Sequence, residues 1–296
     1  MFADFERTSQ PVNGINIHYR IGGSGPPLLL LHGHPQTHVM WHKVAGQLTD
    51  HFTVVAADLR GYGDSDKPPV SEKNHPYSKR EMALDQVGLM SSLGFGRFDI
   101  LAHDRGARVS HRLALDHPGA VNRMILLDIA PTLSMYEQTT EEFARAYWHW
   151  FFLIRPAPLP ETLITADPEN YLRTMLFRLS AGGNPFTGEA IAEYLRCLRL
   201  PGTAAGNCED YRASAGIDLE HDRQDRAAGN RITCPLLVLW GTEGVIGKLF
   251  NPLQEWEKVA DDVQGAGLPS GHFIPEEIPG ILLEHVLNFL HYANRQ

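Results

Sequence analysis

Hydrophobic and polar positions along the chain alternate between short apolar runs and longer stretches of helical pattern. Four runs are apolar at nearly every position, as is typical of strands buried on both faces of a parallel sheet; they span 27–33, 52–59, 98–104 and 122–130. An Asn-Gly turn signal within 12–21 predicts an early hairpin. Helical patterns lie between the runs, at 39–49, 78–93 and 105–116. This alternation predicts an α/β fold, with a mostly parallel central sheet flanked by helices.

The pattern changes after Pro131. Residues 132–228 contain aromatic-rich helical segments and no good buried strand, whereas 234–241 restore the strand pattern and 277–293 predict a closing helix. We therefore expect an α/β core domain made of residues 1–131 and 229–296, interrupted by an inserted helical cap domain at 132–228. Clefts between such units are common ligand sites.

Composition narrows the class of partner. The chain is 43% hydrophobic and 21% charged, as in ordinary soluble proteins, and its net charge of −9 argues against a nucleic-acid partner. The first ten residues lack the pattern of a signal peptide, and no apolar run approaches the ~18 residues of a membrane span. Three scattered cysteines, with no CxxC spacing, predict reduced thiols and a cytoplasmic location.

Chemically active side chains fall at the carboxyl ends of the predicted strands, where open α/β sheets place their active sites. Asp104 lies on a tight turn between a strand and a helix, the context in which many hydrolases hold a serine nucleophile. Asp128 ends the next strand, and His272 lies in a late loop. The order nucleophile, acid, histidine is that of α/β-hydrolases. We therefore predict Asp104, Asp128 and His272 as catalytic residues, with Glu243 as a second candidate for the acid.

An aspartate in place of serine suits displacement at saturated carbon. A carboxylate is ionised at neutral pH and needs no base to attack, and it leaves an ester that water can cleave. His272, held by Asp128, suits the role of base for that water. The backbone N–H groups of His34 and Arg105 are predicted to stabilise the oxyanion on Asp104. The histidines near Asp104 lack the spacing of a metallohydrolase, so we expect no metal and no cofactor.

These residues carry a family resemblance. The sequence resembles the α/β-hydrolase superfamily along nearly its whole length, through HGHPQT (32–37) and DLRGYGDSDKP (58–68), which epoxide hydrolases share. Within it, HDRG at 103–106 followed by Arg108, the YWHW run at 147–150 and Tyr211 resemble the haloacetate (fluoroacetate) dehalogenases. The predicted function is hydrolysis of a short 2-haloacid to glycolate and halide.

The resemblance also implies roles for particular residues. It makes Asp104 the nucleophile, His272 the base and Asp128 the acidic partner of His272. It assigns the substrate carboxylate to Arg105 and Arg108 and the departing halide to three side chains: His149, Trp150 and Tyr211. The substrate is then a small anionic haloacid, and the relatives imply a homodimer.

Two positions depart from the family. His34 stands where relatives have an aromatic residue after the His-Gly pair, and Leu179 stands where they often carry a bulky aromatic. The titratable His34 ring is expected to influence pH dependence or substrate preference. Leu179 leaves the width of the substrate tunnel open.

Other functions remain alternatives. An epoxide hydrolase uses the same Asp/His/acid machinery and needs two tyrosines from the insertion, for which the candidates are Tyr147, Tyr171, Tyr194 and Tyr211. The pair Arg105 and Arg108 disfavours it, because a neutral epoxide has no carboxylate to bind. A haloalkane dehalogenase is also disfavoured, because that family usually has a tryptophan at the position of Arg105. A non-catalytic binding protein on the same scaffold is disfavoured because all three catalytic residues are present.

Overall fold

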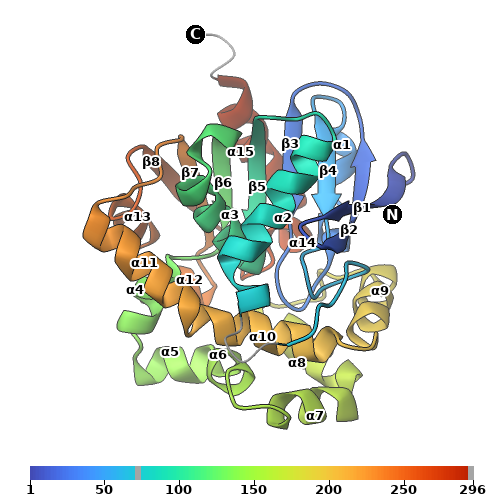
Figure 1. Ribbon diagram of the computed structural model, residues 1–296, viewed down its shortest axis with the longest axis vertical. Coiled ribbons are helices and arrows are strands. Elements are labelled where there is room, and N and C mark those ends of the chain that lie inside the picture. Colours follow the sequence, from blue (N-terminus) through green and yellow to red (C-terminus); the bar gives the residue numbers. More distant parts are fainter. Residues whose placement is uncertain (71–74, 293–296) are drawn as a thin grey trace.

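The fold is built on one eight-stranded sheet (Figure 1). The computed structural model describes residues 1–70 and 75–292. The strand order is β1-β2-β4-β3-β5-β6-β7-β8; β1 and β2 run antiparallel to their neighbours, and β3 to β8 are parallel to one another. The strands are β1 Glu6–Val12, β2 Ile15–Gly22, β3 Pro27–Leu31, β4 Thr53–Ala57, β5 Phe98–His103, β6 Val121–Leu127, β7 Leu236–Gly241 and β8 Val263–Leu268.

Helices cover both faces of the sheet. Those of the α/β part are α1 Ala45–Leu48, α2 Lys79–Ser92, α3 Asp104–Asp116, α12 Val245–Leu249, α13 Pro252–Glu257, α14 Ile274–Glu277 and α15 Pro279–Tyr292, with 3-10 turns η1 His38–Trp41, η2 His75–Tyr77 and η3 Pro118–Ala120. Strand alternation divides the apolar side chains between two cores. On β5, for example, Leu101 packs in one core with Leu282 of α15, whereas Ile100 packs in the other with Leu113 of α3.

The chain between β6 and β7 is helical, which confirms the predicted pattern. This insertion, residues 132–228, contains α4 Thr132–Glu137, α5 Glu141–Ala146, α6 Trp148–Leu153, α7 Leu159–Ala166, α8 Pro168–Leu179, α9 Gly188–Leu198, α10 Thr203–Ser214 and α11 Ile217–Ala228. Helices α5 to α10 lie beyond one end of the strands (Figure 1). The division into a core domain and a cap domain at these boundaries stays a prediction.

Most of the predicted elements are confirmed, with two exceptions. The hairpin forms with Asn13 and Gly14 at its turn, both at positive φ as a tight two-residue turn requires. The single helix expected over 39–49 is wrong, because the segment forms η1 and the short helix α1 instead. The edge strand β8 was not predicted, since its sequence VQGAGL has little apolar character.

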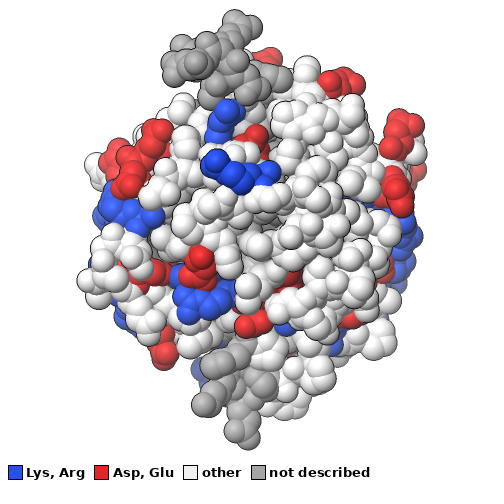
Figure 2. Space-filling model, turned by 45° about the horizontal axis from the view of Figure 1, so that its top comes forward, with Lys and Arg blue, Asp and Glu red and all other residues white. Residues whose placement is uncertain are grey.

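Charged side chains are scattered over one face of the molecule. On the face in Figure 2, basic and acidic side chains are interspersed, and no extended area on that face has a single sign. Within the described residues, no helix combines the length and apolar character that a membrane span needs.

Candidate active site

Asp104 lies on a sharp bend where β5 passes into α3. Its φ of 45° falls in the left-handed region, which non-glycine residues rarely adopt. Two glycines allow the bend, because a Cβ on Gly33 would lie 2.4 Å from Cβ of Asp104 and one on Gly106 would lie 2.5 Å from the His32 carbonyl oxygen. Strain of this kind is found at functional sites that the surrounding structure holds in place.

The two carboxylate oxygens of Asp104 face different groups. Oδ1 accepts a hydrogen bond of 2.9 Å from the backbone N–H of His34. Oδ2 lies 3.9 Å from Nε2 of His272, which is too long for a hydrogen bond. Arg105 is the second residue of α3, so its backbone N–H has no acceptor within the helix. This N–H lies at the same end of the helix as Asp104.

The charge state of Asp104 follows from its surroundings. Burial opposes ionisation, but His272, His103 and the two following arginines outweigh it and lower the pKa of Asp104 below its ordinary value. The carboxylate is therefore ionised at neutral pH. It carries its charge within a buried site, so it is poorly hydrated.

His272 is oriented by Asp128. The Nδ1–H of His272 donates to Oδ2 of Asp128 at 2.6 Å, and the other oxygen of Asp128 accepts the backbone N–H of Gly241 at 2.9 Å. Burial lowers the pKa of His272, but the bond to Asp128 and the charge of Asp128 outweigh it, so the pKa is raised. Nε2 is left facing Asp104. Glu243, the other candidate acid, is exposed on the loop after β7 and does not contact His272.

The loop that carries His272 is fixed by groups that the sequence analysis did not identify. The backbone N–H of His272 donates to the carbonyl oxygen of Leu179, at the end of α8. Glu277 accepts from the backbone N–H groups of Gly271 and Phe273, on either side of the histidine, at 2.9 and 2.8 Å. The acidic residue five positions after His272 was a visible signal, but its contacts depend on how the loop turns.

Arg105 is buried and already has a carboxylate partner. Its Nε and Nη2 donate to the two oxygens of Asp210 on α10 at 2.8 and 2.7 Å, and Nη2 also reaches Ser214. Lys79 forms a further ion pair with Asp210. Only Nη1 of Arg105 is buried without an acceptor. Asp210 lies directly before Tyr211, but nothing in the sequence links it to a residue 105 positions away.

Arg108 differs from Arg105 because it has no carboxylate partner among the described residues. It is buried, and its guanidinium donates to the carbonyl oxygen of Ala130 at 3.2 Å and to Oγ1 of Thr132 at 2.9 Å. Its Nε is buried without an acceptor. The other buried arginines of the described chain, Arg60, Arg105 and Arg112, each pair with aspartate. Burial, followed by the charge of Arg105, lowers the pKa of Arg108 from its ordinary value.

The three predicted halide-binding side chains lie together with the arginines. The Arg105 guanidinium lies 4.1 Å from the Tyr211 ring, and the Arg108 guanidinium lies 4.7 Å from the Trp150 ring. The ring of His149 is 6.0 Å from that of Tyr211. Nε1 of Trp150 is a buried donor without an acceptor, which is unusual unless a ligand supplies one.

A break in the helix explains how neighbouring residues of the YWHW run face one site. Helix α5 ends at Ala146, Tyr147 has φ −107° and ψ 37°, and α6 begins at Trp148. His149 and Trp150 thus lie in the first turn of a new helix. Burial lowers the pKa of His149 well below its ordinary value, so its ring is neutral and has one N–H to donate.

His34 contributes its ring as well as its backbone N–H. Nε2 of His34 lies 2.9 Å from the hydroxyl of Tyr171, and the ring stands edge-on to Tyr211 at 5.4 Å. Burial lowers the pKa of His34 to about 4, so this ring is neutral at pH 7. The substitution of an aromatic by histidine therefore adds a polar, uncharged side chain beside Asp104.

The chain is similar to known α/β-hydrolases over most of its length. The chain matches the α/β-hydrolase fold family over residues 26–276. It is 46% identical to a fluoroacetate dehalogenase from Burkholderia sp., over 94% of this chain and 91% of the relative. It is 36% identical to a soluble epoxide hydrolase from Corynebacterium sp., over 94% of each. An α/β-hydrolase structure from Nostoc sp. PCC 7120 superimposes with a TM-score of 0.96 at 54% identity, covering 98% of this chain and 99% of that one. The chain therefore belongs to the α/β-hydrolase family and, within it, to the haloacetate dehalogenase branch.

Proposed function

We propose that this enzyme hydrolyses the carbon–halogen bond of a short 2-haloacid, such as fluoroacetate or chloroacetate, to give the 2-hydroxyacid and halide. The observation that carries the proposal is Arg108, a buried guanidinium without a carboxylate partner beside an ionised nucleophile. Leaving such a cation uncompensated is costly. A substrate carboxylate supplies the missing partner, and the unpaired Nη1 of Arg105 offers a second donor to it.

In the first step an oxygen of Asp104 attacks the carbon that bears the halogen. A carbon–oxygen bond forms, the carbon–halogen bond breaks, and the halide leaves with the bonding electrons. Attack of one anion on another is unfavourable in water, and the two arginines offset that repulsion while they fix the substrate orientation. The N–H groups of Trp150 and His149 and the hydroxyl of Tyr211 are the proposed donors to the halide.

In the second step water cleaves the ester. His272 accepts a proton from water through Nε2, and the resulting hydroxide attacks the carboxyl carbon of Asp104. The backbone N–H groups of His34 and Arg105 stabilise the oxyanion. The bond between the carboxyl carbon of Asp104 and the ester oxygen then breaks, and the leaving alkoxide takes the proton from His272 to give the hydroxyacid. The carboxyl group of Asp104 loses the second water proton to solvent. One water oxygen remains in Asp104, and the net reaction releases one proton and one halide.

The epoxide hydrolase alternative has weaker support from the site. Of its candidate tyrosines, Tyr171 faces His34, and the Tyr194 hydroxyl donates to Glu276 at 2.6 Å. Tyr147 and Tyr211 border the site, but a neutral epoxide would leave Arg108 without a hydrogen-bonded carboxylate.

The decisive experiment follows products and the fate of water oxygen. The purified protein is incubated with fluoroacetate, chloroacetate or styrene oxide, and halide is read with an ion-selective electrode. We expect halide release from at least one haloacid. After a single turnover in water enriched in oxygen-18, mass spectrometry should find the label in Asp104. Turnover of styrene oxide alone, without halide release, would support the alternative.

A variant separates the two steps. With His272→Asn, we expect the haloacid to lose halide and leave its carboxyalkyl group on Asp104 as an ester. The ester persists because the base for its hydrolysis is missing. Intact-mass analysis detects the adduct, and Asp104→Asn provides the control that cannot form it. An unmodified His272→Asn protein after exposure to a substrate of the wild type would rule out the two-step scheme.

Two further properties belong to the proposal. Cys197, Cys208 and Cys234 are free thiols, which supports a reducing, cytoplasmic location. The homodimer implied by the relatives is checked by light scattering across a concentration series.

A further inference from the structure

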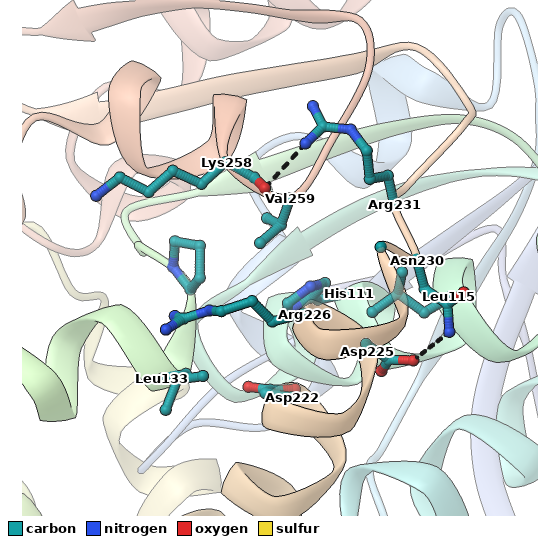
Figure 3. Close-up of a pocket in the computed structure, with 12 residues that line it drawn as sticks. His111, Leu115, Leu133, Asp222, Asp225, Arg226, Asn230, Arg231, Lys258 and Val259 are labelled. Carbon is teal, nitrogen blue, oxygen red and sulfur yellow. Dashed lines mark hydrogen bonds between the residues drawn. The ribbon is translucent and has the colours of Figure 1, made fainter.

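A second pocket lies behind the catalytic helix. It has a volume of about 170 Å³ and is formed by α3, Pro131 with the first turn of α4, the end of α11 and the loops around Arg231 and Val259 (Figure 3). None of the residues assigned above to catalysis, carboxylate binding or halide binding lines it. Its volume is sufficient for a six-carbon ring, since an apolar cavity of about 150 Å³ holds benzene.

The pocket combines apolar walls with one unsatisfied polar group. Leu115, Pro131, Leu133 and Val259 supply apolar surface. His111 is only 5% exposed and lines the pocket, and its Nε2 is buried without a hydrogen-bond partner. Burial lowers the pKa of His111 to about 4, so the ring is neutral. A ligand in the pocket would satisfy this nitrogen.

Cations surround one part of the pocket. Figure 3 shows Arg231 and Lys258 at one end and Arg226 crossing beside His111. Arg226 pairs with Glu137 only at the surface, where both side chains are about half exposed, so this pair is weak. Arg231 pairs with Asp261, and its Nη1 and Nη2 donate to backbone carbonyl oxygens, so it has no nitrogen left for a ligand. Lys258 pairs with Glu255.

The acids that line the pocket are already engaged. Asp222 accepts from Arg112 at 2.9 Å. Asp225 accepts from Arg112 at 2.6 Å and from Asn230 at 2.8 Å. Asp222 and Asp225 therefore share the single charge of Arg112. Arg226 and Lys258 each pair with one carboxylate and keep further N–H groups for the carboxylate of a ligand.

We propose that this pocket binds a small organic acid of about benzoate size, with its flat apolar body against Leu115, Leu133 and Val259 and its carboxylate toward Arg226 and Lys258. His111 forms the floor of the site and bonds the ligand through Nε2.

Ligand binding here has a route to the active site. Alternate residues of one short segment face the two sites: Pro131 and Leu133 line the pocket, whereas Ala130 and Thr132 bind Arg108. On α3, Arg108 and His111 are three positions apart. If Arg108 holds the substrate carboxylate, as proposed above, occupation of the pocket changes KM for the haloacid more than kcat.

Binding is tested by fluorine NMR with para-fluorobenzoate, which needs no turnover. We expect line broadening that saturates, and about ten-fold weaker binding of neutral para-fluorobenzyl alcohol because it lacks the charged hydrogen bond. Leu133→Trp and Val259→Trp fill the pocket from two walls and should abolish the signal. Leu163→Trp, at a surface position on α7 that is 55% exposed, is the matched control and should leave it unchanged.

Benzoate is a carboxylate, so binding in the active site must be separated from binding in the pocket. Arg108→Leu removes the proposed active-site anchor, and we expect the pocket signal to persist in it. The proposal would be overturned if Arg108→Leu lost binding while the folded Val259→Trp variant kept it. It would also be overturned if the wild type bound no para-fluorobenzoate. Persistence in Arg108→Leu supports it whether or not the protein releases halide. In the kinetic arm, benzoate should alter KM in the wild type through a component that Val259→Trp lacks.

Discussion

Two neighbouring arginines on α3 have opposite electrostatic surroundings. Arg105 and Arg108 are both buried, but Asp210 compensates the first while the second has only neutral acceptors. Arg108 therefore hydrogen-bonds no carboxylate, although the nearby charge of Asp104 acts on it. Its free donors suit a substrate with a single negative charge. A site with two free guanidiniums would favour a dianion.

The Arg105–Asp210 pair gives a stability prediction. Asp210→Asn leaves Arg105 buried without a carboxylate, whereas Lys79 keeps Asp218 at 3.6 Å. We expect the free energy of unfolding to fall by about 3–5 kcal/mol. Urea unfolding followed by tryptophan fluorescence measures it. Glu169→Gln, which breaks a half-exposed pair with Arg173, is the control and should cost less than about 1 kcal/mol. Equal losses in the two variants would contradict this account of the site.

Trp150 gives a prediction about the leaving group. Trp150→Phe keeps a ring over Arg108 but removes the buried indole N–H. We expect kcat/KM for fluoroacetate to fall by about a hundred-fold, and for chloroacetate by less, because fluoride depends most on donated hydrogen bonds. Halide release from both substrates is the measurement.

The control for that experiment is another buried tryptophan. The Nε1 of Trp256 donates to the carbonyl oxygen of Ile129 at 2.9 Å, outside the proposed halide site. Trp256→Phe should lower stability and leave the ratio of fluoroacetate to chloroacetate activity unchanged. A similar change of that ratio in both variants would remove Trp150 from the halide site.

At the scale of elements, the entry to α3 decides where the nucleophile lies. The strand β5 is buried along its whole length, and the helix begins at Asp104 itself. Close approach of Gly33 and Gly106 to their neighbours brings β3 and α3 together at this bend. The N-terminal end of α3, with its unpaired backbone N–H groups, therefore lies at Asp104.

The close packing at this bend is tested by a substitution at Gly106. Gly106→Ala places a Cβ 2.5 Å from the His32 carbonyl oxygen, and backbone must move to accommodate it. We expect a loss of about 1–3 kcal/mol in unfolding free energy, with a drop in kcat as Asp104 shifts. Gly46→Ala, where the added Cβ meets nothing within 4 Å, is the matched control. It should be neutral or stabilising, by up to about 1 kcal/mol, in thermal and urea unfolding. Normal activity and stability of Gly106→Ala would contradict the steric argument.

At the scale of the whole molecule, a buried acid joins the insertion to the α/β part. The Tyr194 hydroxyl of α9 donates to Glu276 of α14 at 2.6 Å, and Nε2 of Gln36 reaches the same hydroxyl at 3.2 Å. Lys43 and His42 face the other oxygen of Glu276 at 3.6 and 3.8 Å. Burial raises the pKa of Glu276 to about 7, although Tyr194 and Lys43 oppose the shift.

That shift predicts a pH dependence of stability. Folded protein keeps the proton of Glu276 up to pH about 7, whereas the unfolded chain loses it near the ordinary pKa of 4.5. The stability that protonated Glu276 gives to the folded protein is therefore fully present below pH 4.5 and is lost as the pH rises toward 7. Relative to the wild type, Glu276→Gln should gain on the order of 2 kcal/mol across this interval. Urea unfolding at several pH values tests it, and parallel pH profiles would contradict the buried-acid assignment.

Local sequence patterns predicted most strands of the sheet, the bend at Asp104, and Asp128 and His272 as candidates. Apolar runs and turn residues are local signals, and the carboxyl ends of parallel strands meet at one edge. The irregular segment 38–48 and the weakly apolar strand β8 were not predicted correctly, because tertiary packing outweighs weak local preferences there.

Tertiary structure decided which groups are partners. Asp128 and not Glu243 bonds His272, and Asp210 pairs with Arg105 while Arg108 has only neutral acceptors. The helix breaks at Tyr147, so that His149 and Trp150 begin a new helix at the proposed halide site. These outcomes depend on the approach of segments that lie up to 144 positions apart. The charge on a side chain is written in the sequence, but the compensation of that charge depends on which distant segment packs against it, and so it is a property of the folded chain.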